Sequence, residues 1–191
     1  MKQLLKVIQL YKNETKLIEA SIENNRDAQR ILYETYAPKM LSVCRSYITD
    51  LQYAEDVMVN GFCKVFSHLK SFKNEGSFEG WIRRIMVRES IDFLRKRKDI
   101  EFPVEEMHQE KHLQGYADLD IGISEMQQLI DELPEGYRVV FVMFAIEGYK
   151  HHEIAELLNI SEGTSKSQLF KARKLLQEKL NQINTASYGT K

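Results

Sequence analysis

Six side chains in the last third of the chain have the types and spacing needed to contact a nucleic-acid duplex. They are Lys166, Ser167, Phe170, Lys171, Arg173 and Lys174. Lysine and arginine bind phosphate oxygens and guanine edges, and a solvent-facing phenylalanine can meet a thymine methyl group. The opposite stripe of a helix would consist of Ser165, Leu169, Ala172 and Leu176. The pattern predicts a helix that buries one side and presents the other to DNA.

Residues 151–161 predict a short partner helix and a tight turn. The apolar face of this helix would consist of Ile154, Ala155, Leu157 and Leu158. Asn159 tolerates left-handed backbone, and Ser161 is a favourable N-cap. Two helices joined in this way are typical of a helix-turn-helix, whose second helix enters the DNA major groove. The alternative is an ordinary amphipathic helix with a solvated basic face; the capped turn and the preceding helix favour the DNA reader.

A second cationic helix is predicted at residues 78–98, after a loop at 73–77 and an N-cap at Ser77. Its buried stripe would consist of Phe78, Trp81, Ile82, Ile85, Ile91 and Leu94. Its cations are Arg83, Arg84, Arg88, Arg95, Lys96, Arg97 and Lys98. Such a helix beside a polar loop suits a single strand, whose phosphates it neutralises while bases stack or enter pockets. Alternatively, the aromatic residues belong to the core and the arginines are solvated.

Composition and cysteine use argue against several other classes of protein. No apolar run approaches the ~20 residues of a membrane span, and no signal-peptide pattern opens the chain. Cys44 and Cys63 lie in helical patterns without a CxxC pair, so we expect buried reduced thiols and a cytoplasmic protein. His108 and His112 are four residues apart but lack nearby cysteine partners, so we expect no metal site and no cofactor.

The charges are segregated along the 191 residues, although the formal net charge is only −1. Residues 1–100 carry 18 Lys and Arg against 13 Asp and Glu, residues 101–135 carry 1 against 10, and residues 136–191 carry 8 against 5. This distribution suits two DNA-contacting modules on an acidic connector. Helical apolar spacing recurs throughout both modules and no strand pattern is convincing, so the predicted fold class is all-α.

Five segments occur in an order and at a spacing that make a family resemblance specific. They are AEDVMVNGFCKVF (54–66), GSFEGWIRRI (76–85), IDFLRKRK (91–98), LPEGYRVVFVMFAIEGY (133–149) and EIAELLNISEGTSKSQLFKARKLL (153–176). Together they resemble the extracytoplasmic-function (ECF) sigma factors, compact bacterial initiation factors that have sigma domains 2 and 4 only. The resemblance runs from about residue 27 to residue 180.

The resemblance implies two small helical domains and a function in transcription. Sigma domain 2, a helical bundle, would occupy residues 15–98, and sigma domain 4, a four-helix unit with the helix-turn-helix, would occupy residues 122–183. An acidic linker would lie at 99–121, with tails at 1–14 and 184–191. The protein would be no enzyme. It would bind RNA polymerase core at the clamp helices and flap and direct initiation by recognising the −35 duplex and the single-stranded −10 element of promoter DNA.

The resemblance also assigns site residues. The polymerase-docking surface would include Glu55, Asp56, Asn60 and Phe62. The −10 element would be read by Phe72, Lys73, Asn74, Ser77, Arg84, Arg88, Asp92 and Arg95. The −35 duplex would be contacted by Lys166, Ser167, Phe170, Lys171, Arg173 and Lys174.

Several positions depart from common residues of the family. This chain has Val59 and Asn60 where glutamine and an acid are common, and Arg88 where asparagine is common. Ser165 and Gln168 stand where valine and arginine are frequent. We therefore expect a −10 preference and a −35 preference of its own.

Three further expectations concern partners and the linker. The acidic linker resembles DNA in charge and could occupy the template or RNA channel of the polymerase. The free protein should bind promoter DNA weakly, because each module is small. An anti-sigma factor is a further partner that the sequence neither requires nor excludes.

The sequence argues against two other classes of protein. A two-component output regulator shares the final helices, but it needs a phosphoacceptor or ligand domain, and residues 54–98 show no strand-alternating acidic pocket. An all-helical enzyme needs a nucleophile with a base, a phosphate loop or paired carboxylates. The adjacent Glu55 and Asp56 face different directions on a helix, so they do not form such a pair.

Overall fold

The computed structural model describes the backbone of residues 14–97 and 123–188, with side chains for 14–97 and 125–183. The chain divides into two compact units, Met1–Phe93 and Leu94–Lys191, which are described separately. The described residues form helices and contain no strand, which confirms the all-α class. The predicted linker, the N-terminal lead, His108 and His112 lie outside the described residues.

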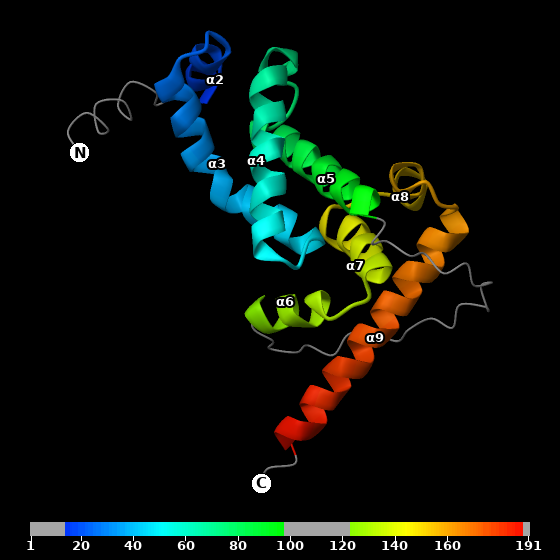
Figure 1. The fold of residues 1–191 in the computed structure, drawn as a ribbon. Coiled ribbons are helices and arrows are strands. Elements are labelled where there is room, and N and C mark those ends of the chain that lie inside the picture. Colours follow the sequence, from blue (N-terminus) through cyan, green and yellow to red (C-terminus); the bar gives the residue numbers. More distant parts are fainter. Residues whose placement is uncertain (1–13, 98–122, 189–191) are drawn as a thin grey trace. The chain divides into compact units, whose positions relative to one another are not determined.

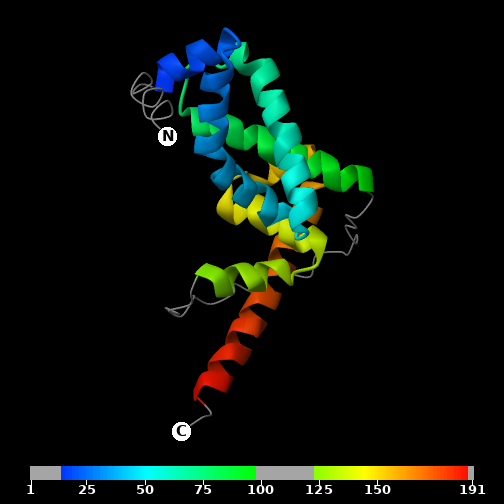
Figure 2. The same ribbon diagram turned by 60° about the vertical axis from the view of Figure 1, so that its left-hand side comes forward.

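Unit 1 contains four α-helices in the described range. They are α2 (Glu14–Ile22), α3 (Arg26–Tyr47), α4 (Leu51–His68) and most of α5 (Phe78–Arg97), whose last turn lies beyond Phe93, with a single 3₁₀ turn, η1 (Leu69–Ser71), after α4. Helix α3 packs along α4, and α2 packs on α3, as Figures 1 and 2 show. Helix α5 starts after the predicted loop, in which Asn74 and Gly76 have φ values of 57° and 95°.

Side-chain caps fix where three of these helices begin. The Ala28 amide donates to Asn25 Oδ1 at 3.1 Å, and the Tyr53 amide donates to Asp50 Oδ1 at 3.1 Å. The predicted cap Ser77 is confirmed, because its Oγ accepts from the Gly80 amide at 3.0 Å. Each cap satisfies a donor that the first helical turn leaves unpaired.

Helix α3 runs through Pro38 without a break. Proline removes one amide donor and therefore leaves the carbonyl group of Glu34 without its helical partner. Pro38 and Glu34 are both exposed, so water can satisfy that carbonyl group. The helix continues because the proline lies on its solvent side.

The core of unit 1 depends on a close approach of α5 to α4. A Cβ added to Gly61 of α4 would lie 2.4 Å from the Met86 Sδ of α5, and Met86 is 0% exposed. Cys44 of α3 is also 0% exposed, and burial raises the pKa of its thiol to about 11. The prediction that both thiols are buried is wrong for Cys63, which is exposed on α4. It lies just beyond the edge of the helix's apolar stripe.

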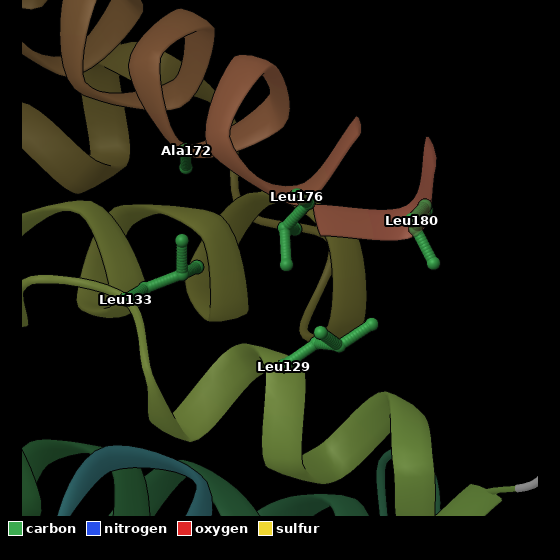
Figure 3. Packing of buried hydrophobic residues seen from close by; sticks show 5 residues of the cluster. All are labelled: Leu129, Leu133, Ala172, Leu176 and Leu180. Carbon is green, nitrogen blue, oxygen red and sulfur yellow. The ribbon is translucent and has the colours of Figure 1, made fainter. Parts of the chain in front are cut away.

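Unit 2 contains four α-helices in the described range. They are α6 (Ile123–Asp131), α7 (Glu135–Phe141), α8 (His151–Leu158) and α9 (Glu162–Tyr188), and α7 continues into a π-helical turn, η2 (Val142–Ile146). Figure 3 shows Ala172, Leu176 and Leu180 of α9 beside Leu129 of α6 and Leu133, which lies between α6 and α7. Helix α9 runs to Tyr188, so it extends into the residues predicted as a tail, 184–191.

A buried arginine joins the end of α6 to the start of α7. Arg138 is 4% exposed and donates through Nη1 to the carbonyl oxygen of Asp131 at 3.2 Å. Its Nη2 donates to Glu135 Oε1 at 3.4 Å. A buried guanidinium is tolerated only with such partners, so Arg138 fixes the turn at Pro134.

Within the described ranges, no helix is both long and apolar enough to cross a membrane. The same residues contain no group of three or more His, Cys, Asp or Glu side chains that could hold a metal ion.

Replacing Gly61 with alanine should lower the stability of the protein. Overpacking against buried Met86 costs about 1–3 kcal/mol, which exceeds the roughly 0.5–1 kcal/mol gained by removing glycine from a helix interior. In the control Gly163→Ala, the new Cβ would meet only Ser161 Oγ at 3.5 Å. We expect calorimetry to show an unfolding midpoint for G61A below that of the wild type. The midpoint of G163A should not be lowered. An unchanged midpoint for G61A would contradict the close helix crossing.

Candidate nucleic-acid interface

The turn between α8 and α9 has the geometry predicted for a helix-turn-helix. Asn159 adopts the left-handed conformation, with φ 55° and ψ 49°, and its amide bonds back to α8. Ser161 Oγ accepts from the Thr164 amide at 2.9 Å, which confirms the predicted N-cap. Ile154 and Leu158 of α8 are buried, and so is the predicted stripe of Ser165, Leu169, Ala172 and Leu176 on α9.

The opposite side of α9 presents polar and basic groups. Lys166 and Lys174 are exposed, and Lys166 Nζ lies 3.9 Å from Glu162 Oε2. Ser167 is half-buried, and its hydroxyl donates to the carbonyl oxygen of Thr164 at 3.0 Å. An exposed ion pair of this kind is weak, so phosphate can replace Glu162 as the partner of Lys166.

Three more of the predicted duplex contacts are half-buried, as Ser167 is, rather than solvent-facing. Phe170, Lys171 and Arg173 are each partly covered. Lys171 Nζ lies 6.0 Å from the ring centroid of Tyr137, and Arg173 Cζ lies 5.6 Å from that of Phe144. Arg173 Nε is buried without a hydrogen-bond partner among the described residues. The expectation of a solvent-facing Phe170 therefore holds only in part, because neighbouring side chains cover its ring.

The structure also shows contacts that the sequence did not predict. Phe144, in the π-helical turn, stacks on His151 at the start of α8, with ring centroids 4.6 Å apart and planes at 24°. His151 Nδ1 shares a hydrogen bond with Ser165 Oγ at 2.8 Å. Gln168 is 0% exposed, and its amide has no hydrogen-bond partner in the described part of the chain. Ser165 and Gln168 thus face the protein interior.

Helix α5 presents the predicted single-strand contacts along one stripe. Arg84, Arg88, Asp92 and Arg95 are all exposed, at spacings of three or four residues. Lys73, Asn74 and Ser77 are exposed in the preceding loop. The stripe and the loop meet at the start of α5, so a strand could follow both.

An aromatic cluster supports this loop from behind. Phe72 is half-buried, with its ring centroid 5.1 Å from that of Phe78 and 5.6 Å from that of Trp81. Phe78 also lies edge-on to Tyr36 at 5.5 Å. Burial and the carboxylate of Glu14 raise the pKa of Tyr36, so its hydroxyl stays protonated and donates to Glu14 Oε1 at 2.8 Å. Phe72 therefore anchors the loop, in addition to any contact with a base.

Three of the four predicted docking residues on α4 are exposed, and the fourth is buried. Glu55, Asp56 and Asn60 are exposed, as is Val59 (47%), which sequence reasoning did not select. Phe62 is only 3% exposed and lies 4.8 Å from the ring of Tyr33. The prediction that Phe62 is part of an accessible surface is therefore wrong, because the residue belongs to the core of unit 1. The exposed thiol of Cys63 lies one turn beyond Val59 and Asn60.

Comparison with known proteins identifies both halves of this arrangement. Residues 32–100 match the family model described as Sigma-70 region 2, and residues 123–176 match Sigma-70, region 4. The ECF RNA polymerase sigma factor SigW of Bacillus subtilis (strain 168) is 27% identical over 181 residues, covering 88% of this chain and 97% of the relative. The RNA polymerase sigma factor SigV of the same strain is 30% identical over 141 residues, covering 71% of this chain and 80% of the relative.

A solved structure shares the fold. The sigma factor RpoE from Bartonella quintana, in complex with the anti-sigma factor NepR, aligns with a TM-score of 0.50 at 22% identity, over 80% of this chain and 96% of that one. At this identity the likeness concerns the fold alone. The two family matches and the relatives show function as well: the chain belongs to the ECF sigma factors, which recognise promoters for RNA polymerase.

Proposed function

We propose that this chain divides promoter recognition between its two units, with α9 contacting the −35 duplex and α5 contacting the single-stranded −10 element. The observation that carries this proposal is the exposed face of α9. There, Lys166, Ser167 and Lys174 follow a capped helix-turn-helix turn while the opposite stripe is buried. A helix held in this way presents its first turns to base edges and its lysines to phosphates.

The proposed −10 site combines charge with a supported loop. The arginines of α5 can neutralise the backbone of a separated strand, and the loop at 73–77 offers polar groups to bases that have left the stack. Capturing extruded bases offsets an unstacking cost of a few kcal/mol. The aromatic cluster around Phe72 holds the loop in place for this purpose.

The proposed docking site for polymerase core is the exposed face of α4. It combines the carboxylates of Glu55 and Asp56 with the apolar side chain of Val59 and the amide of Asn60. An apolar group with polar neighbours is typical of protein interfaces. Phe62 supports this face from within the core.

We extend the proposal to the location of the protein, its part in the chemistry and a further partner. The protein acts in the cytoplasm, where polymerase and promoters are. It contributes no catalytic step of its own, because the polymerase performs the chemistry. An anti-sigma factor is a partner that would cover these faces; binding of such a factor is known here for the Bartonella relative.

Run-off transcription tests the proposed function directly. Core polymerase would be incubated with this protein and genomic DNA fragments, and transcript starts would be mapped. We expect starts at a small set of positions that share −35 and −10 sequences. Transcription no different from that of core polymerase alone would overturn the proposal. A nanomolar footprint by the protein alone would also contradict it, since each unit offers few contacts.

Lys166→Ala should weaken holoenzyme binding to a mapped promoter duplex and reduce its salt dependence. One lost phosphate contact lowers the slope of log K against log salt by about 1. The matched control is Lys179→Ala, which removes the same charge from α9 where the lysine pairs with Glu132. Filter binding at several salt concentrations would measure both slopes. Equal slopes for K166A, K179A and the wild type would contradict the proposed −35 face.

Core polymerase should protect Cys63 from thiol reagents. Cys63 is exposed on the proposed docking face, whereas the pKa of buried Cys44, about 11, leaves roughly a thousandth of that thiol ionised at pH 8. We expect an aromatic disulfide reagent to modify Cys63 rapidly in the free protein and slowly in the holoenzyme. Cys44 serves as the internal control, and Cys63→Ser should abolish the fast phase. Unchanged reactivity of Cys63 at saturating polymerase would rule out this docking face.

A further inference from the structure

The start of α8, the π-helical turn and the first turn of α9 are joined by one set of side-chain contacts. His151 shares a hydrogen bond with Ser165 across the helix-turn-helix, 14 residues apart in sequence. The same imidazole stacks on Phe144, whose ring also lies 5.6 Å from the guanidinium carbon of Arg173. Three elements of unit 2 therefore converge on His151.

We propose that His151 is a positioning residue for promoter recognition: through its hydrogen bond to Ser165 and its stack on Phe144, it sets the orientation of the first turn of α9. This inference rests on the proposed contact of α9 with the −35 duplex. It assigns to His151 an indirect role, because Ser165 is 0% exposed and both contacts of the imidazole are made with side chains of unit 2.

Because of the position of Ser165 in α9, this hydrogen bond can influence the orientation of the first turn of the helix. Ser165 directly precedes Lys166 and Ser167, and its amide donates to the carbonyl oxygen of the N-cap Ser161 at 3.0 Å. The hydrogen bond from His151 therefore acts on the same turn that begins the DNA-facing side. Side chains at the start of a recognition helix contact base edges, where hydrogen bonds tolerate little displacement.

The same contacts explain the environment of Arg173. Its guanidinium lies over Phe144 and its Nε is buried, so the side chain is held against the turn rather than extended toward solvent. A cation over an aromatic ring is attracted by the negative face of the ring, and more strongly when desolvated. We therefore assign Arg173 to the support of the helix-turn-helix, together with Phe144 and His151.

A double-mutant cycle separates positioning from simple loss of stability. His151→Phe keeps an aromatic ring against Phe144 but leaves the buried Ser165 hydroxyl without its partner. Ser165→Ala in the same chain removes that hydroxyl. Replacing both members of a buried polar pair can be nearly neutral for the stability of the fold, although the hydrogen bond stays absent. The matched control is His152→Phe, the same substitution at the neighbouring, exposed histidine.

The readout is binding of the holoenzyme to a promoter duplex mapped by run-off transcription, and to versions with each −35 base pair replaced. We expect H151F to weaken binding by about five- to thirtyfold, as the loss of part of one base contact would. H151F should also reduce discrimination between the original and replaced −35 sequences, with an unchanged salt slope. H151F/S165A should bind within about twofold of H151F, because both variants lack the hydrogen bond, and H152F should match the wild type.

Each other outcome has a definite meaning. A lower active fraction, from loss of stability alone, would weaken binding to all sequences equally and leave discrimination unchanged, which would overturn the inference. Wild-type binding by H151F, or recovery of wild-type discrimination by H151F/S165A, would do the same, because the double variant still lacks the hydrogen bond. If H151F does not fold, His151→Asn, whose amide can still reach Ser165, should bind more tightly than His151→Ala. Equal binding by these two variants would count against the inference. If K166A also binds as the wild type does, the proposed −35 contact itself fails.

Discussion

Burial of one side of α9 is the interaction on which the geometry of the proposed DNA-contacting side depends. Ala172, Leu176 and Leu180 pack with Leu129 and Leu133, and burial of each leucine contributes roughly 1.5–3 kcal/mol (Figure 3). A helix is a rigid cylinder, so fixing its buried stripe also fixes where the opposite side chains point. The exposed lysines contribute little to folding and are available to exchange Glu162 or water for phosphate.

Helix α5 is divided in the same way, at some cost to the free protein. Arg84 and Arg88 are four residues apart, and like charges at this spacing destabilise a helix by a few tenths of a kcal/mol. Buried Ile82, Met86 and Val87 hold the helix in place despite that repulsion. Asp92, four residues after Arg88, offsets part of this repulsion, and the remaining positive charge is what the proposed contact with an anionic strand would use.

Local chemistry explains which parts of the structure were predictable from sequence. The caps Ser77 and Ser161 and the turn at Asn159 depend on neighbouring residues alone. The burial of Phe62 and the exposure of Cys63 were not predicted, because helical periodicity does not fix the edge of a buried stripe to within one residue. The π-helical turn and the His151–Ser165 hydrogen bond depend on packing between distant segments, for which one sequence contains no local signal.

The inward orientation of Ser165 and Gln168 limits what α9 can read. The side chains left for the proposed −35 contact are few, and a good bidentate base contact discriminates by about 1–3 kcal/mol. A handful of such contacts does not support tight binding by unit 2 alone, since association itself costs several kcal/mol. Holding both units on one polymerase makes the second contact intramolecular, which raises its effective concentration. Selectivity for a promoter would then come from the −35 and −10 contacts acting together, with the polymerase supplying the geometry that joins them.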